Sequence, residues 1–164
     1  MTNVAFVSRK RSGLLLVLFL LFVCFSCNPT QTGDEKEIIS VIEKFFDGFA
    51  AKDTTVIWET LLREGTFQRV NEDGNVTVVS HAAFLRGIAS TEDDLLEIIE
   101  EPETRIQGRL AFVWVPYVLY RNGERHHCGV NAFNMVKTPE GWMIAEIVYS
   151  YETRCGKYPL NHSD

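Results

Sequence analysis

The sequence predicts an α+β domain, in which helices come first and a meander of β-strands comes last. The first half of the chain holds segments with helical periodicity, and the last third holds long β-rich runs that are separated by turn sequences. A hydrophobic content of 46% over 164 residues is enough for one core. We therefore expect a single domain over residues 35–152, followed by a tail over residues 153–164.

The predicted helices lie in the first half of the domain. Residues 35–51, EKEIISVIEKFFDGFAA, carry their isoleucines and phenylalanines on one broad face of a helix. Asp53 is placed to cap a second, short helix that runs through Trp58, Leu61 and Leu62. Residues 81–90, HAAFLRGIAS, form the third predicted helix.

The predicted strands begin between these helices and continue to the end of the domain. A small hairpin is expected over residues 66–70 and 76–79, joined by NEDGN, and residues 95–100 fit either a helix or a strand, of which we expect a strand. Three long strands are then predicted over residues 109–121, 124–137 and 142–151. The first two are joined by Asn-Gly, the strongest short hairpin signal.

Residues 1–27 read as a signal peptide and not as part of the core. A basic cluster at residues 9–11 precedes an apolar run that is shorter than the ~20 residues needed to span a bilayer. The run ends at Cys27, and this ending resembles a bacterial lipoprotein signal, in which the cysteine is lipidated and becomes the new N-terminus. Cys24 occupies a position where leucine is usual, so plain secretion and an uncleaved anchor also stay open. In each case the domain is expected outside the cytoplasm, in the bacterial periplasm or on the cell surface.

The charge of the exported part excludes one class of partner. Residues 28–34 read as a tether. Loss of residues 1–27 leaves 13 basic against 22 acidic residues, a net charge of about −9. Because nucleic acid binding needs clustered lysines and arginines, we expect no nucleic acid partner, and we expect membrane attachment through the lipid anchor.

The turn at residues 122–123 also predicts which side chains share a face of the sheet. A regular two-residue hairpin places Asn131 opposite Trp114, and a turn after residue 138 places Glu146 opposite Phe133. The opposite face is moderately apolar, which suggests a partner surface for a homodimer. The face predicted to meet the helices carries Phe112, Trp114, Pro116, Val118, His127, Gly129, Asn131, Phe133, Met135, Trp142, Ile144, Glu146 and Val148.

The segment HHCGVNAF, residues 126–133, concentrates reactive side chains. On a regular strand His126 and His127 point to opposite faces and cannot share a metal ion, so neither a metal nor another cofactor is expected. Cys128 has only His126 on its own face, two residues away on the same strand, which is poor geometry for a nucleophile. A small buried hydrophobe is the simpler interpretation of Cys128.

Cys128 and Cys155 remain as an even pair in an oxidising compartment. The predicted register puts Cys155 about 13 Å along the chain from the residue opposite Cys128, at ~3.3 Å per residue. A disulfide therefore forms only if the chain doubles back after Glu152, and it stays a possibility.

The last predicted site is a pocket wall. His127 and Glu146 would be roughly 20 Å apart along the sheet, too far for an acid–base pair. We predict instead that Trp114, His127, Asn131 and Glu146 contact a small, largely apolar ligand, with Trp114 as a stacking surface. Each of them could equally be a structural residue.

The order of helices and meander, together with WVPYVLYRNG at 114–123, HCGVNAF at 127–133 and GWMI at 141–144, resembles the nuclear transport factor 2-like superfamily, most closely its exported SnoaL-like bacterial members. The resemblance implies a cone-shaped, curved antiparallel sheet covered by the N-terminal helices, with a pocket between them and often a dimer. It implies no particular reaction. We expect an exported domain for ligand binding or assembly; the alternative is an isomerase or dehydratase that uses Glu146 or His127 for proton transfer.

Overall fold

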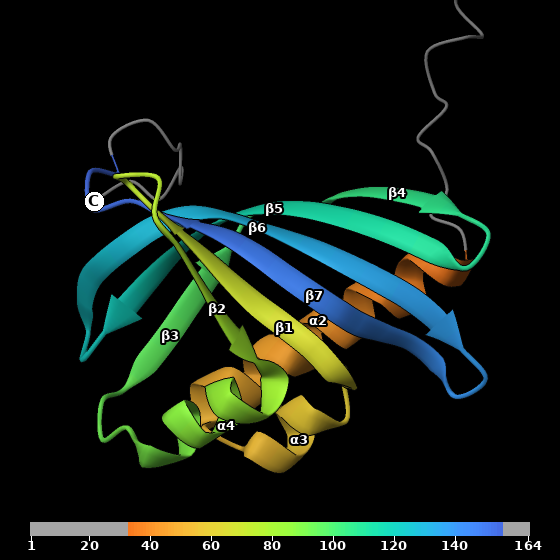
Figure 1. The fold of residues 1–164 in the computed structure, drawn as a ribbon, viewed down its shortest axis with the longest axis horizontal. Coiled ribbons are helices and arrows are strands. Elements are labelled where there is room, and N and C mark those ends of the chain that lie inside the picture. The colour runs from red at the N-terminus through yellow and green to blue at the C-terminus, as the bar shows by residue number, and fades with distance from the viewer. Residues whose placement is uncertain (1–32, 156–164) are drawn as a thin grey trace, which may run out of the picture. The chain divides into compact units, whose positions relative to one another are not determined.

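The structure, a computed structural model, describes residues 33–155 (Figure 1). The predicted signal peptide with Cys27, the tether before residue 33 and the tail after residue 155 lie outside the described residues. The helices and strands, in chain order, are α2 (Gly33–Ala51), α3 (Thr54–Trp58), β1 (Leu61–Asn71), β2 (Val76–Ser80), α4 (His81–Ser90), β3 (Leu95–Ile99), β4 (Glu103–Gln107), β5 (Leu110–Arg121), β6 (Glu124–Thr138) and β7 (Gly141–Tyr151).

The sheet is curved and open, and the helices lie on one side of it (Figure 1). Its seven strands follow the order β2-β1-β7-β6-β5-β3, with β4 pairing β5 beside β3. This confirms the α+β class and the curved sheet covered by N-terminal helices. One detail differs: β1 runs parallel to β7, and every other pair is antiparallel, so the sheet is mixed. A parallel pair needs a long connection, and here α4 and most of the sheet separate the two strands.

Three helices form near the predicted positions, but the second is shorter than predicted. Helix α3 ends at Trp58, and Leu61 and Leu62, which were expected to continue it, begin β1. Helix α2 buries Ile38, Ile42, Phe45 and Phe49 against the sheet. The Asp53 carboxylate accepts hydrogen bonds from the backbone amides of the next helix, at 3.0 and 3.1 Å, and so caps α3. Helix α4 spans the predicted residues.

Residues 95–99 form a strand, as expected, and β4 was not predicted. The β4 sequence ETRIQ has five residues, of which only Ile106 is apolar, and it carries two charges. Such a short edge strand has a weak sequence signal, because most of its stability comes from pairing with β5.

A β-bulge at His126 changes the predicted register between β5 and β6. Tyr120 pairs with Arg125 and Leu119 pairs with His127, so His126 has no partner across the ladder. From there to Leu110 every β5 residue is shifted by one position relative to the prediction, and a shift of one moves side chains to the other face. The helix-covered face of β5 therefore carries Val113, Val115, Tyr117 and Leu119, all buried.

A second bulge, at Ala145, has the same effect on β7. Met135 pairs with Ile144 as predicted, whereas Asn134 pairs with Glu146, and Ala145 lies between them without a partner. Glu146 consequently turns to the outer face, and Ile147 and Tyr149 take the inner one. Among residues 33–155, none of the helices has the length and hydropathy of a membrane-spanning segment.

Candidate ligand-binding cavity

A cavity of about 110 Å³, partly open to solvent, lies between the helices and the inner face of the sheet. Its wall is mainly aromatic. Phenylalanines come from α2, β1, α4 and β6: Phe45, Phe46, Phe49, Phe67, Phe84 and Phe133. These rings pack on one another, for example Phe67 on Phe84 with centroids 3.9 Å apart and Phe45 on Phe67 at 6.0 Å.

One carboxyl group enters this apolar space. Glu97 of β3 lines the cavity, and the side-chain amide of Asn131 donates a 2.6 Å hydrogen bond to its Oε1. Burial raises the pKa of Glu97 to about 7, and the hydrogen bond from Asn131 opposes that rise. At neutral pH this carboxyl group is therefore close to half-ionised and can either donate or accept a hydrogen bond.

The other polar groups of the wall are neutral near pH 7. Burial, followed by the charges of His126 and Arg69, lowers the pKa of His127 to about 4, so its imidazole is uncharged. Burial also raises the pKa of Tyr117 and that of Tyr149, with the Glu97 charge adding to both shifts. The Tyr117 hydroxyl donates a 2.8 Å hydrogen bond to the Ser150 carbonyl.

Gly129 makes that last contact possible. It lies directly across the ladder from Tyr117. A Cβ atom at Gly129 would come within 2.1 Å of the Ser150 carbonyl oxygen, so only glycine leaves space there. The bulge at His126 places Tyr117, and not Pro116, opposite Gly129, so Pro116 and Gly129 do not share the predicted face.

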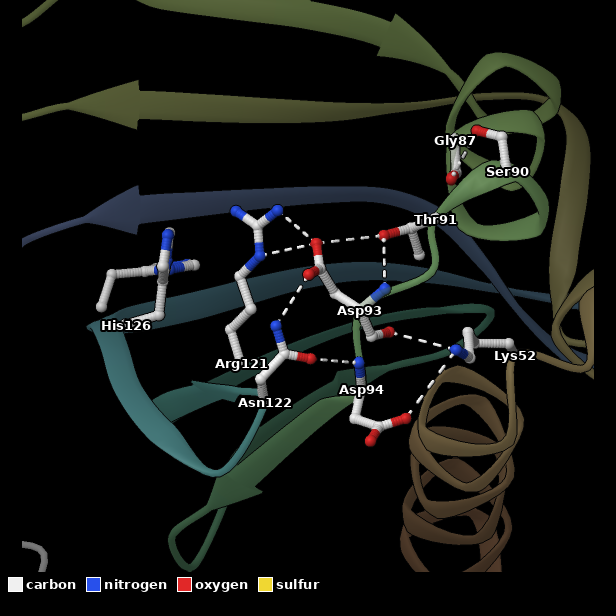
Figure 2. A network of polar contacts seen from close by, with 10 residues as sticks. Lys52, Gly87, Ser90, Thr91, Asp93, Asp94, Arg121, Asn122 and His126 are labelled. Atoms are coloured by element: carbon white, nitrogen blue, oxygen red, sulfur yellow. Dashed lines mark hydrogen bonds and ion pairs between the residues drawn. The ribbon is translucent and has the colours of Figure 1, made fainter.

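Strand β3 holds Glu97 in place. Glu97 pairs with Leu119 of β5, which puts both side chains on the inner face. A polar network fixes the start of this strand (Figure 2): Asp93 accepts hydrogen bonds from the Arg121 guanidinium, at 2.7 Å from Nε, and from the Asn122 amide at 2.8 Å. Lys52, at the end of α2, donates to the Asp93 carbonyl at 3.1 Å.

The network thus joins three parts of the chain at the entry to β3: the end of α2, the segment after α4 and the β5–β6 turn (Figure 2). Asn122 adopts a φ of 55°, as the two-residue turn requires, and its Oδ1 accepts from the Asp94 amide at 2.8 Å. The Arg121 hydrogen bonds lower the pKa of Asp93, which keeps this anchor ionised.

The structure brings two of the four predicted ligand contacts to the cavity. His127 and Asn131 line it, next to the phenylalanine wall. Trp114 and Glu146 do not, because the two bulges turn them to the outer face. Trp114 is 43% exposed, and the Glu146 carboxylate is held by Gln68 and, at 2.8 Å, by the Asn134 amide.

Glu97 is the cavity residue that the sequence analysis missed. Its signal was a single glutamate within the apolar run LLEII, residues 95–99. A carboxyl group at the central, inward position of a short apolar strand is costly to bury, so a single glutamate in such a run indicates a candidate site residue.

The reactive residues of HHCGVNAF are also accounted for. Cys128 and Cys155 form a disulfide, with Cα atoms 5.7 Å apart. It forms because Glu152 pairs with Cys128 and the chain then turns, held by the 2.8 Å hydrogen bond from the Thr153 hydroxyl to Glu72.

The bulge brings the Nδ1 atoms of His126 and His127 within 2.8 Å, contrary to the prediction that the two rings point apart. Within residues 33–155, no three His, Cys, Asp or Glu side chains are grouped so as to hold a metal ion.

Solved structures with the same arrangement define the class of fold. A nuclear transport factor 2-like protein with a cystatin-like fold from Novosphingobium aromaticivorans aligns with a TM-score of 0.62 and 16% identity. The alignment covers 87% of this chain and 92% of that one. A nuclear transport factor 2-like protein of unknown function from Shewanella baltica has a TM-score of 0.58 and 16% identity, over 76% and 100%. One from Streptomyces avermitilis, described provisionally as a dehydratase of the same family, has a TM-score of 0.57 and 16% identity, over 71% and 94%.

The chain therefore has the nuclear transport factor 2-like fold. No protein-family model matches the sequence, and no curated protein matches it either. At these identities the similarity establishes the fold and leaves the function to be argued from the cavity.

Proposed function

We propose that this domain binds a small, largely apolar ligand in the cavity and that Glu97 and Asn131 form hydrogen bonds with one polar group of that ligand. The observation that carries the proposal is a carboxyl–amide pair inside a wall of phenylalanines. Apolar walls with a few convergent polar groups are typical of ligand sites. A volume of about 110 Å³ suits a ligand group close to benzene in size, since a dry engineered cavity of ~150 Å³ binds benzene.

Filling the cavity tests the proposal. Small fluorinated aromatic probes are titrated into the full-length protein, in lipid nanodiscs, and binding is followed by ¹⁹F NMR. Phe46 is only partly buried, so Phe46→Trp should occupy the cavity while the fold is retained, and should abolish binding. The matched control is Phe112→Trp, the same change on the outer face, which should bind as the parent does. Equal binding by both variants would reject the site.

We further propose that this binding takes place outside the cytoplasm, with the domain tethered to a membrane through Cys27. The Cys128–Cys155 disulfide supports an oxidising compartment. Labelled fatty acid should be incorporated into the parent and not into Cys27→Ala. Incorporation of the label into the variant would show that the lipid is attached at a residue other than Cys27.

A homodimer through the outer face of the sheet is part of the same proposal. Phe112 and Trp114, 37% and 43% exposed, give that face an apolar area. Sedimentation should give a dimer for the parent and a monomer for Trp114→Glu; a monomeric parent would reject it.

A second candidate is a proton-transfer enzyme of isomerase or dehydratase type. The observation that favours it is the pKa of Glu97, about 7, which suits a general acid or base at neutral pH. Glu97 replaces Glu146 and His127 in this role, because Glu146 lies on the outer face and the His127 imidazole is uncharged with a pKa of about 4. Solvent deuterium should enter the α-carbon of a small bound ketone, and should not do so with Glu97→Gln.

A further inference from the structure

We propose that the ligand group held in the cavity is a small organic ammonium ion, with Glu97 as its counter-ion and the aromatic wall as its cage. The inference rests on the proposed function and names the chemical class of its ligand. Three features carry it: the pairing of Glu97, the composition of the wall, and the size of the space.

Glu97 has no cationic partner in the part of the chain that the structure describes. Lysine and arginine form ion pairs with Asp34, Glu59, Asp93 and Asp94 there, and none with Glu97. Its hydrogen bond comes from the neutral amide of Asn131. A partly buried carboxylate in an apolar cavity, without a positive partner, is costly, and a bound cation would lower that cost.

The wall around this carboxyl is the kind that binds cations. The six phenylalanines are joined by Tyr117 and Tyr149. Aromatic faces attract ammonium groups, most strongly where water is excluded, and aromatic cages are used to hold quaternary ammonium ligands. A purely aliphatic wall would hold a neutral ligand equally well, so the aromatic composition favours the positive charge.

The space suits a compact head group. About 110 Å³ fits a trimethylammonium or a similar group, which is close to benzene in size, with the rest of the ligand directed to the open side. A large ring system would not fit without displacing the phenylalanines.

The charged form of Glu97 would then control binding. The groups that face it are neutral near pH 7: His127 on β6, with a pKa of about 4, and the two tyrosines on β5 and β7, whose pKa values are raised. Helix α2 contributes only phenylalanines to the wall. Arg69 acts on Tyr149 and His127 and is not among the causes of the Glu97 shift. Ammonium affinity should therefore follow the ionisation of Glu97.

The test compares choline with 3,3-dimethyl-1-butanol, which has the same shape and carries carbon in place of the charged nitrogen. Calorimetry uses the full-length protein in phosphatidylglycerol nanodiscs, which contain no ammonium lipid, with empty nanodiscs as the blank. We expect choline to bind at least tenfold more tightly than its neutral isostere at pH 8. Its affinity should fall about tenfold from pH 8 to pH 6, because ionisation of a group with a pKa near 7 falls by that factor.

Two variants separate charge from shape. Glu97→Gln should lose choline binding at least tenfold and keep the isostere. Phe46→Leu should weaken choline alone, since it keeps an apolar surface and removes an aromatic face. Binding of the isostere with equal or weaker binding of choline would overturn the ammonium inference and leave the proposed function standing. Binding of neither would overturn both, and choline binding that ignores pH and Glu97→Gln would overturn the role of Glu97.

Discussion

Among single residues, Glu97 is expected to make the stability of the domain depend on pH. Its pKa rises from the ordinary value of 4.5 to about 7 on folding. A carboxyl with a raised folded pKa contributes stability below pH 4.5, and this contribution is lost as the pH rises through the folded pKa near 7. The reason is that the unfolded chain ionises freely over that range and the folded one does not.

We therefore predict that Glu97→Gln changes the pH dependence of stability. The free energy of unfolding of the variant, measured relative to the parent, should increase by about 3 kcal/mol between pH 4.5 and pH 7, at ~1.4 kcal/mol per pKa unit. Urea unfolding at several pH values measures it. A difference that stays constant with pH would show that the carboxyl is solvated in the folded protein.

Single residues also show how much of the candidate site can be predicted from the sequence alone. Asn131 and His127 were correctly expected on the inner face, because alternation along one strand depends only on that strand. Trp114 and Glu146 were expected there too and lie outside, since their placement depended on the pairing between strands. Glu97 was missed because it lies on a short strand whose pairing partner could not be deduced.

At the scale of helices and strands, local signals were sufficient for most elements. Amphipathic periodicity identified α2, and capping residues and turn sequences identified α3 and the β5–β6 hairpin. The bulges at His126 and Ala145 carry no comparable signal, because a bulge is a property of two paired strands and of the curvature of the sheet. The first bulge reverses the predicted faces of β5, and the second reverses those of β7 after Ala145, which explains why Trp114 and Glu146 were misplaced.

The cap of α3 gives a prediction at this scale. Asp53→Ala removes the acceptor for the backbone amides of Thr55 and Val56. We expect it to lower the free energy of unfolding by about 1 kcal/mol, measured by urea denaturation. Asp53→Asn, which can cap equally well, is the control and should match the parent; an equal loss in both variants would assign the effect to charge instead of capping.

At the scale of the whole domain, the disulfide ties the end of the sheet to the strand that carries His127 and Asn131. It closes a loop between residues 27 positions apart in the chain. Cross-links of this span stabilise by restricting the unfolded chain.

We predict that Cys155→Ala lowers the free energy of unfolding by about 3 to 4 kcal/mol, the chain-entropy value for such a loop. Chemical denaturation with and without reductant measures it. The parent in reductant should match the variant, and reductant should leave the variant unchanged. A parent that is insensitive to reductant would mean that the bond is absent in solution.

The proposed ligand site depends on the partly buried carboxyl group of Glu97 in an aromatic cavity, and one titration tests this most directly. Full-length protein labelled with ¹³C in glutamate is titrated from pH 4 to pH 9, and the Glu97 side-chain carbon is assigned by its loss in Glu97→Gln. We predict half-ionisation near pH 7. A midpoint near the ordinary 4.5 would contradict the proposal, because it would place the carboxyl in water and leave the cavity without its carboxylate contact.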